Sequence, residues 1–237
     1  DMLNNLPQVT KNLLILNIIF FVAKLFLTSQ GIDLAGKLGA HYVNSPYFEP
    51  FQVVTHFFMH ANFIHIFFNM WIFVMLGGYL ERVWGPKRFF IFYIISAFGA
   101  FALFNVIGVY EIETLKAQII EQGNSIREIN RLTAFTSNDT INEYLIMINT
   151  PMVGASGAIF GVMSAFAILF PNTEFRLYFA IPIKAKWFVG AYFLFEVYLS
   201  YLNDSGDSTA HLAHVGGAIV GAIIVLIWRK KDRTNFW

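Results

Sequence analysis

Apolar residues in this chain gather into long runs that polar segments separate. A helix needs about 20 predominantly apolar residues to cross a bilayer, and six runs approach that length. Their bounds are Leu13–Thr28, Phe63–Leu80, Phe89–Val109, Met152–Phe170, Trp187–Leu202 and His211–Trp228. The pattern predicts an all-α fold, a polytopic bundle of six transmembrane helices.

Composition agrees with a membrane protein and narrows the possible functions. Of the 237 residues, 57% are hydrophobic and 13% are charged, whereas about 25% are charged in a soluble domain. A formal net charge of +1 argues against nucleic acid as a partner, because that partner requires a basic surface. Without cysteine, the chain has no disulfide, thiolate metal site or cysteine nucleophile. We expect one membrane domain over residues 1–237.

Basic residues fall mainly on one side of the predicted bundle. That side carries Lys11, Arg82, Lys87, Arg88, Arg176, Lys184, Lys186, Arg229, Lys230, Lys231 and Arg233. The opposite side carries Lys37, Lys116, Arg127 and Arg131 among many acidic residues. The positive-inside rule therefore places both termini in the cytoplasm. We do not expect the first run to be a cleavable signal peptide, because Lys24 lies inside it and no small-residue cleavage site follows.

Two connections on the outer side are long. Residues 29–56 are rich in Gly, Pro and aromatic residues, which indicates a loop that dips partly into the membrane interface. Residues 110–150 form a polar insertion in which we expect one or two amphipathic surface helices. Their apolar positions at helical spacing are Ile112, Leu115, Ile119, Ile126, Ile129 and Leu132. Such an insertion is either functional or passive, and both interpretations stay open.

Polar residues open the second apolar run, "THFFMHANFIHIFFNMW". Asn62 is a typical helix N-cap, and His65 and Asn69 then lie four residues apart on one face of the helix. His56 and His60 precede the helix, and we expect their hydrogen bonds to tie the outer loop to it. Histidines also suggest a metal site, but the chain lacks H-E-x-x-H and Asn69 is a poor zinc ligand. We therefore predict no metal.

The sixth run opens "TAHLAHVGGAIVGAII" and carries a histidine above two glycines. His214, Gly217 and Gly221 follow the spacing i, i+3 and i+7, so they share one face of a helix. The G-x-x-x-G spacing allows two membrane helices to approach closely. The fourth run has the same spacing at Gly157 and Gly161. If the two glycine faces pack together, His214 comes close to a serine at the outer end of the fourth helix.

That serine is Ser156, which follows Pro151 and Gly154 where the fourth helix should begin. A serine becomes a nucleophile when a neutral histidine such as His214 accepts its proton. The backbone N–H of the first helical residue has no partner inside the helix and points where an oxyanion develops. Taken alone, G-x-S-G is also the packing pattern of many membrane helices. All of these groups, however, lie at the outer ends of the second, fourth and sixth runs.

These residues resemble those of the rhomboid intramembrane serine proteases. The resemblance rests on "HFFMHANFIHIFFN", "GGYLERVWG", "GASGAIFG" and "AHVGGAIVG", and it covers nearly the whole chain. Six spans with both ends inside are also similar to the basic bacterial form. The resemblance implies an enzyme, a serine endopeptidase without a cofactor, and we expect it in a bacterial plasma membrane. It implies transmembrane proteins as substrates and the lipid bilayer as surroundings, and the oligomeric state stays open.

The resemblance also implies individual roles. Ser156 is the nucleophile and His214 the general base and acid, while His65, Asn69 and the Ser156 N–H form the oxyanion hole. Gly154 shapes the turn that exposes the serine. Gly157, His60 and Phe160 complete the surroundings of the site, with Phe160 in a position where some family members have a tyrosine that packs on the base.

Other ionisable residues also bear on these assignments. His211 competes with His214 for the role of base, but only His214 has glycines three and seven residues later. Glu81 and Arg82 are expected to anchor the connection to the third span. No carboxylate in the sequence is placed to act as a third triad member. We expect Glu196 in the fifth span to be structural or to line a gate.

The substrate implied by the resemblance is a transmembrane helix that is cut near its outer end. We expect the fifth span and residues 203–210 to form a mobile gate and cap. Two other classes of function stay open: a protease-inactive relative that binds membrane proteins, and a small transporter that uses the histidines as a polar path. The transporter is disfavoured because the ionisable groups cluster at one end of the predicted bundle.

Overall fold

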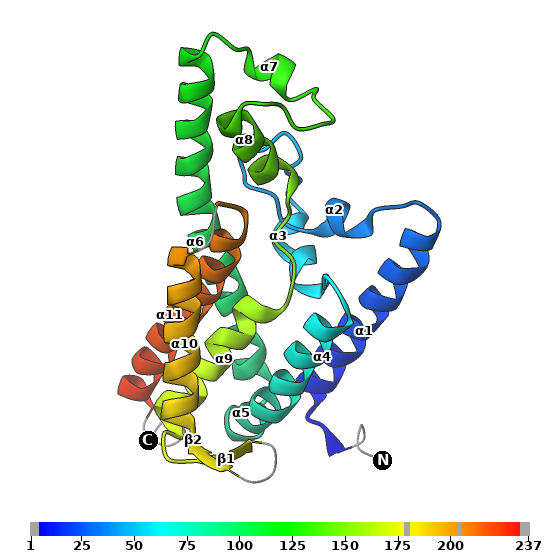
Figure 1. Cartoon of the computed structure of the whole chain (residues 1–237). Helices are drawn as coiled ribbons and strands as arrows, with labels where there is room; N and C mark the ends of the chain where they lie inside the picture. The colour runs from blue at the N-terminus through cyan, green and yellow to red at the C-terminus, as the bar shows by residue number, and fades with distance from the viewer. Residues whose placement is uncertain (1–4, 178–180, 203–204, 233–237) are drawn as a thin grey trace.

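The computed structural model describes residues 5–177, 181–202 and 205–232, without the side chains of residues 175–177, 181, 195–197, 199–202 and 205–210. Most of the described chain is helical, with one short β-hairpin (Figure 1). The elements are α1 (Gln8–Ser29), α2 (Leu34–Leu38), α3 (Gln52–Thr55), the 3₁₀ turn η2 (His56–Phe58), α4 (Phe63–Ile72), the π-helical turn η3 (Phe73–Gly77), α5 (Gly78–Trp84), α6 (Pro86–Glu121), α7 (Ile126–Ile129), α8 (Asp139–Asn149), α9 (Ser156–Leu169), β1 (Glu174–Leu177), β2 (Ile181–Lys184), α10 (Ala185–Leu202) and α11 (Ser205–Lys231).

The long helices coincide with the apolar runs. Among the described residues, four helical stretches have the length and composition to cross a membrane: Gln8–Ser29, Phe63–Trp84, Pro86–Glu121 and His211–Lys231. The fourth run forms α9, which is apolar but only 14 residues long. The fifth run lies on α10. The predicted helical fold of an apolar membrane protein is therefore confirmed.

The fourth run does not become helical where its apolar pattern begins. We expected a span from Met152, but α9 starts at Ser156. Met152 forms an isolated antiparallel bridge with Ala40, in which each N–H donates to the other carbonyl at 2.8 Å. Gly154 has φ +125°, which is outside the helical region and strained for any residue with a side chain. These contacts keep residues 152–154 out of the helix, which then starts at the serine.

The outer insertion is built around α6 rather than on a separate surface helix. Ile112, Leu115 and Ile119 form one apolar helix face as expected, but the helix is the continuation of α6 to Glu121 rather than a separate surface helix, and all three residues are buried. After α7, Asn138 caps α8 by accepting a hydrogen bond from the Ile141 N–H at 3.2 Å. The helices α7 and α8 lie beside the upper end of α6 (Figure 1). An apolar cluster joins α8 to α6, so the insertion has its own core.

Two local features do not follow the predicted pattern. Strands β1 and β2 pair antiparallel between α9 and α10, with Glu174 opposite Lys184. The helix α11 begins at Ser205, so the expected loop over residues 203–210 is helical from that residue onward. Residues 203–204 lie outside the described part of the chain, as does the side chain of Glu196, and their predicted gate roles stay predictions.

Glu81 anchors the start of α1, which corrects the expectation that it anchors the connection to the third span. Its buried carboxylate accepts hydrogen bonds from the N–H groups of Val9 and Thr10 at 2.8 and 2.7 Å. The Thr10 hydroxyl donates to the same carboxylate at 2.8 Å. Arg82 donates to the Asn5 carbonyl at 3.0 Å. A carboxylate at a helix N-terminus satisfies otherwise unpaired N–H groups, and Pro7 has no side chain that could do so.

The core lies where α9 is surrounded by the other helices (Figure 1). One apolar cluster joins α1, α4, η3, α5, α6 and α9, and a second joins α6, α8 and the outer end of α11. The large apolar side chains of α1 that face outward, such as Phe26 at 64% exposure, suit contact with lipid. This packing places the N-terminus of α9 at the meeting point of the two clusters.

Candidate active site

Ser156 and His214 meet although they are 58 residues apart in the sequence. The distance between Ser156 Oγ and His214 Nε2 is 2.8 Å, which is a hydrogen bond. Ser156 is the first residue of α9 and His214 lies on α11. A neutral histidine whose Nε2 lacks a proton accepts this bond from the serine hydroxyl. That arrangement is the chemical prerequisite for activating a serine.

Close contact between α9 and α11 brings the two side chains together. A methyl group at Gly217 would overlap the Gly157 carbonyl oxygen, and one at Gly221 would lie 2.6 Å from the Gly161 Cα. At Gly161, it would lie 2.5 Å from Ser96 Oγ on α6. The prediction that the two glycine faces meet is therefore confirmed. The helices approach backbone to backbone because hydrogen is the only side chain that fits.

Stacked rings fix the plane of the His214 imidazole. The Phe160 ring lies parallel to it, with 4.6 Å between centroids and 6° between planes. Tyr192 of α10 also stacks on Phe160, with 5.2 Å between centroids. The expectation that His214 packs against Phe160 is confirmed. His211, the other candidate base, presents its ring edge-on to His214 at 6.1 Å, whereas it is His214 that reaches Ser156.

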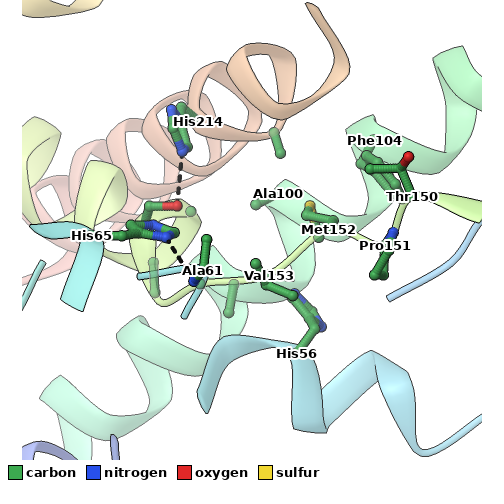
Figure 2. A pocket seen from close by; sticks show the side chains of 16 residues that line it. His56, Ala61, His65, Ala100, Phe104, Thr150, Pro151, Met152, Val153 and His214 are labelled. Atoms are coloured by element: carbon green, nitrogen blue, oxygen red, sulfur yellow. Dashed lines mark hydrogen bonds between the residues drawn. The ribbon is translucent and has the colours of Figure 1, made fainter. Parts of the chain in front are cut away.

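A cavity of about 290 Å³ lies beside this pair (Figure 2). Its lining residues are His56, Ala61, His65, Ala97, Ala100, Phe104, Thr150, Pro151, Met152, Val153, Gly154, Ser156, Gly157, Ala158, Ala213 and His214. One water occupies about 30 Å³ in the liquid. The cavity therefore has room for several waters or for a few residues of an extended peptide.

His65 also lines the cavity, from α4 rather than from the helix that carries His214 (Figure 2). Its helix starts as predicted, since Asn62 Oδ1 accepts a hydrogen bond from the His65 N–H at 2.9 Å. A Cβ built on Gly154 would lie 3.0 Å from His65 Nε2 and 3.3 Å from Ser156 Oγ. His65 Nε2 and the serine oxygen thus face the same small space. Only a glycine at residue 154 leaves that space open.

Asn69 lies one turn deeper on α4 than His65. Its side chain is buried and does not line the cavity. Within the described residues, its Nδ2 group has no hydrogen-bond partner. A buried amide donor without a partner is unfavourable. The structure thus brings His65 but not Asn69 to the cavity lining, and the oxyanion-hole role of Asn69 stays a prediction.

His56 lines the cavity, whereas His60 lies next to His65 without lining it. His56 Nδ1 donates to the Gln52 carbonyl at 2.8 Å, and the His56 carbonyl accepts from the Gly154 N–H at 3.0 Å. The His56 ring therefore bonds inside the outer loop, and the His56 carbonyl ties that loop to the segment before α9. Among the described residues, neither ring nitrogen of His60 has a hydrogen-bond partner. The expectation that hydrogen bonds from these two rings tie the outer loop to α4 is therefore wrong. The His60 ring packs edge-on against His65, with centroids 5.0 Å apart. Burial lowers the pKa of His56 to about 4 and that of His60 to about 3, so both are neutral near pH 7.

Several lining residues had no signal in the sequence. Ala97 and Ala100 of α6 form one wall, and the Ala100 methyl lies against Gly157. Thr150 and Met152 form another through the extended segment before α9. Their side chains carry no distinctive chemistry, so only the small residues of "SAFGA" in the third run hinted at close packing there. Among the described residues, no three His, Asp or Glu side chains form a potential metal site.

Fold and site together define a helical membrane protein in which a serine and a histidine meet at a cavity. Residues 47–231 match the Rhomboid domain, and the chain belongs to the rhomboid family. The match includes all residues of the cavity and the four sequence motifs that suggested the family. The predicted family is therefore confirmed.

Named relatives come from bacteria, fungi and plants. The rhomboid protease AarA of Providencia stuartii is 28% identical over 72% of this chain and 53% of its own length. The mitochondrial RHOMBOID-like protein 12 of Arabidopsis thaliana is 26% identical over 78% of this chain and 47% of its own length. A mitochondrial rhomboid protein of Schizosaccharomyces pombe, named uncharacterized, is 38% identical over 35% of this chain and 23% of its own length. The chain thus spans about a quarter to a half of the length of these relatives.

Proposed function

We propose that this protein is an intramembrane serine endopeptidase with a Ser156–His214 dyad. The observation that carries the proposal is the 2.8 Å hydrogen bond between Ser156 Oγ and His214 Nε2 at the edge of a cavity. Membership of the rhomboid family, which includes a relative named a protease, supports the same chemistry. The proposed substrates are transmembrane proteins, cut near the outer end of a membrane helix.

The reaction would start when His214 Nε2 removes the proton of the Ser156 hydroxyl. The serine oxygen then attacks the scissile carbonyl carbon, and the carbonyl oxygen becomes an oxyanion. His65 Nε2–H, the Ser156 backbone N–H and Asn69 Nδ2 are the proposed donors to that oxyanion. Protonated His214 gives its proton to the leaving amine, which leaves an acyl-enzyme. A water, deprotonated by His214, cleaves the ester and regenerates the serine.

We further propose that all six predicted runs cross the membrane with both termini in the cytoplasm. The start of α1 and the end of α11 lie at the same end of the molecule, with the β1–β2 hairpin, and α7 and α8 lie at the other (Figure 1). The basic residues of the sequence concentrate toward the first of these ends. Two of the relatives above are named mitochondrial, so the bacterial plasma membrane stays a prediction.

The first experiment is covalent labelling of the purified protein with a fluorescent fluorophosphonate. We expect labelling of the wild type and a loss of about 10³-fold or more in rate for Ser156→Ala and His214→Ala, because each removes one partner of the dyad. Ser164→Ala is the matched control, since this serine lies two turns away on the same helix and does not line the cavity.

Cleavage of a transmembrane substrate should be retained in the wild type and in Ser164→Ala and lost in Ser156→Ala and His214→Ala. A folded wild type that neither labels nor cleaves would contradict the proposal and favour a protease-inactive protein that binds membrane clients. Ion flux through reconstituted protein that persists in Ser156→Ala, without proteolysis by the wild type, would favour a transporter.

A further inference from the structure

Lys24 makes an unusual contact for a cation in a membrane helix. It lies near the outer end of α1 and is half-buried. Its ammonium donates hydrogen bonds to the His60 carbonyl at 2.8 Å and to the Ala61 carbonyl at 2.5 Å. A lysine near a helix end usually extends its ammonium toward water. Here it binds the two residues that precede the α4 N-cap.

One of these carbonyls belongs to a peptide group with a second role. The His60 carbonyl and the Ala61 N–H are the two ends of the same amide. The Ala61 N–H donates to Nδ1 of His65 at 3.3 Å (Figure 2). A neutral imidazole accepts at Nδ1 only when its proton is on Nε2. The contact therefore selects the His65 tautomer that presents an N–H on the side of Gly154 and Ser156.

Lys24 acts on that selection through the amide. A cation at the carbonyl oxygen polarises the peptide group and makes its N–H a stronger donor, because hydrogen bonds in a chain reinforce one another. Electron density withdrawn at Nδ1 of His65 in turn makes Nε2–H a stronger donor. A Cβ built on Gly154 would lie 3.0 Å from His65 Nε2 and 3.3 Å from Ser156 Oγ, so the Nε2–H faces the same space as the serine oxygen.

We propose that Lys24 is a positioning residue for the oxyanion hole. Through the His60–Ala61 peptide, it holds His65 in the Nε2–H tautomer and strengthens that donor toward the oxyanion. The inference rests on the proposed serine protease function. The helix α1 supplies no residue to the cavity lining. Through Lys24 it would nevertheless affect the oxyanion donor on α4.

The test compares Lys24→Met, which keeps a flexible chain but loses the donors, with Lys24→Arg, which keeps them. We expect Lys24→Met to lower kcat and the rate of fluorophosphonate labelling about ten- to a hundredfold, with KM within about twofold of wild type. Lys24→Arg should keep most of the wild-type kcat and labelling rate. Lys11→Met is the matched control, because it makes the same change at the other end of α1, and its rates should equal those of the wild type.

A second measurement reports on the tautomer itself. In protein labelled with ¹⁵N-histidine, His65 is assigned by comparison with His65→Gln. We expect the Nε2–H form in the wild type and a growing share of the Nδ1–H form in Lys24→Met. A purely structural anchor would lower the unfolding temperature without moving this equilibrium.

Two results separate the inference from the function on which it rests. If the wild type labels and cleaves while Lys24→Met matches it in kcat and tautomer, Lys24 has no positioning role and the protease stands. If the folded wild type neither labels nor cleaves, the proposed function fails, and the inference falls with it.

Discussion

At the scale of single residues, the candidate site depends on atoms that do not react. Gly154 has φ +125°, and a side chain there would lie 2.9 Å from His65 Cε1. Phe160 holds the plane of His214 by parallel stacking. The absence of a hydroxyl on Phe160 leaves orientation of the base to ring contact and helix packing. Such a site depends on the shape of its surroundings, and small changes beside it should have large effects on rate.

The protonation of buried His56 gives a prediction about acid stability. Burial lowers the pKa of His56 to about 4 from an ordinary value of 6.5. Between these two pKa values the unfolded chain binds a proton that the folded chain does not. The free energy of unfolding is therefore unaffected by His56 above pH 6.5 and decreases as the pH drops toward 4. We expect His56 to contribute a loss of about 2 kcal/mol between pH 7.5 and pH 5.

His56→Phe tests this contribution, because it keeps an aromatic ring and cannot titrate. The free energy of unfolding in detergent is measured at pH 7.5 and pH 5 for both proteins. The loss in the variant should be smaller by about 2 kcal/mol, and part of it should remain because the pKa of His60 is also lowered by burial, to about 3. Equal losses in the two proteins would show that His56 is not the source.

At the scale of elements, the contact between α9 and α11 determines whether the site exists. The two helices touch at Gly157, Gly161, Gly217 and Gly221. Ser156 and His214 lie at the outer end of this contact. In α4, η3 and α5, by contrast, a continuous helix passes through a π-helical turn at Phe73–Gly77. Such turns are rare and interrupt the regular helical ladder. The glycine contact follows from sequence spacing, whereas the π-helical turn does not.

Gly217→Ala should weaken the α9–α11 contact. The added methyl would overlap the Gly157 carbonyl oxygen, so the helices must separate at a cost of about 1–3 kcal/mol. We expect a lower unfolding temperature in detergent and a loss of fluorophosphonate labelling, since His214 moves with α11. Gly190→Ala on α10 is the control, because a methyl there meets nothing within 4 Å. Equal unfolding temperatures and labelling rates in the two variants would contradict the role of the glycine contact.

At the scale of the whole molecule, α6 links the membrane part to the outer insertion. Its 36 residues extend about 54 Å at 1.5 Å per residue, which exceeds the roughly 30 Å of a bilayer core. The outer part buries Ile112, Leu115 and Ile119 against α8 and the segment that leads to α9. The insertion therefore packs on the same segment that leads to Ser156.

The proposed topology gives a prediction for the whole chain. Because the sequence has no cysteine, single substitutions report on one site each. On intact cells that express the protein in the plasma membrane, a membrane-impermeant maleimide should label Asp139→Cys in α8 and should not label Arg229→Cys in α11 before lysis. Both residues are exposed, so burial does not confuse the comparison. Labelling of Arg229→Cys on intact cells would reverse the orientation.

Much of this architecture could be predicted because its causes are local. The apolar runs, the Asn62 cap and the glycine spacing are readable from a few neighbouring residues. The start of α9 was predicted too early, since its apolar pattern begins before the residues that Ala40 and Gly154 hold extended. The role expected for Glu81 at the connection to the third span was also wrong, because the carboxylate caps a helix that begins about 70 residues earlier.

The sequence by itself therefore determined the helical membrane class, the family and the residues able to form a serine–histidine pair. These properties depend on composition, periodicity and residue type. Only the tertiary structure decided that Ser156 lies 2.8 Å from His214 and that Lys24 reaches the peptide before α4. Those partners are 58 and 36 residues apart, and their contact depends on how whole helices pack rather than on any local pattern.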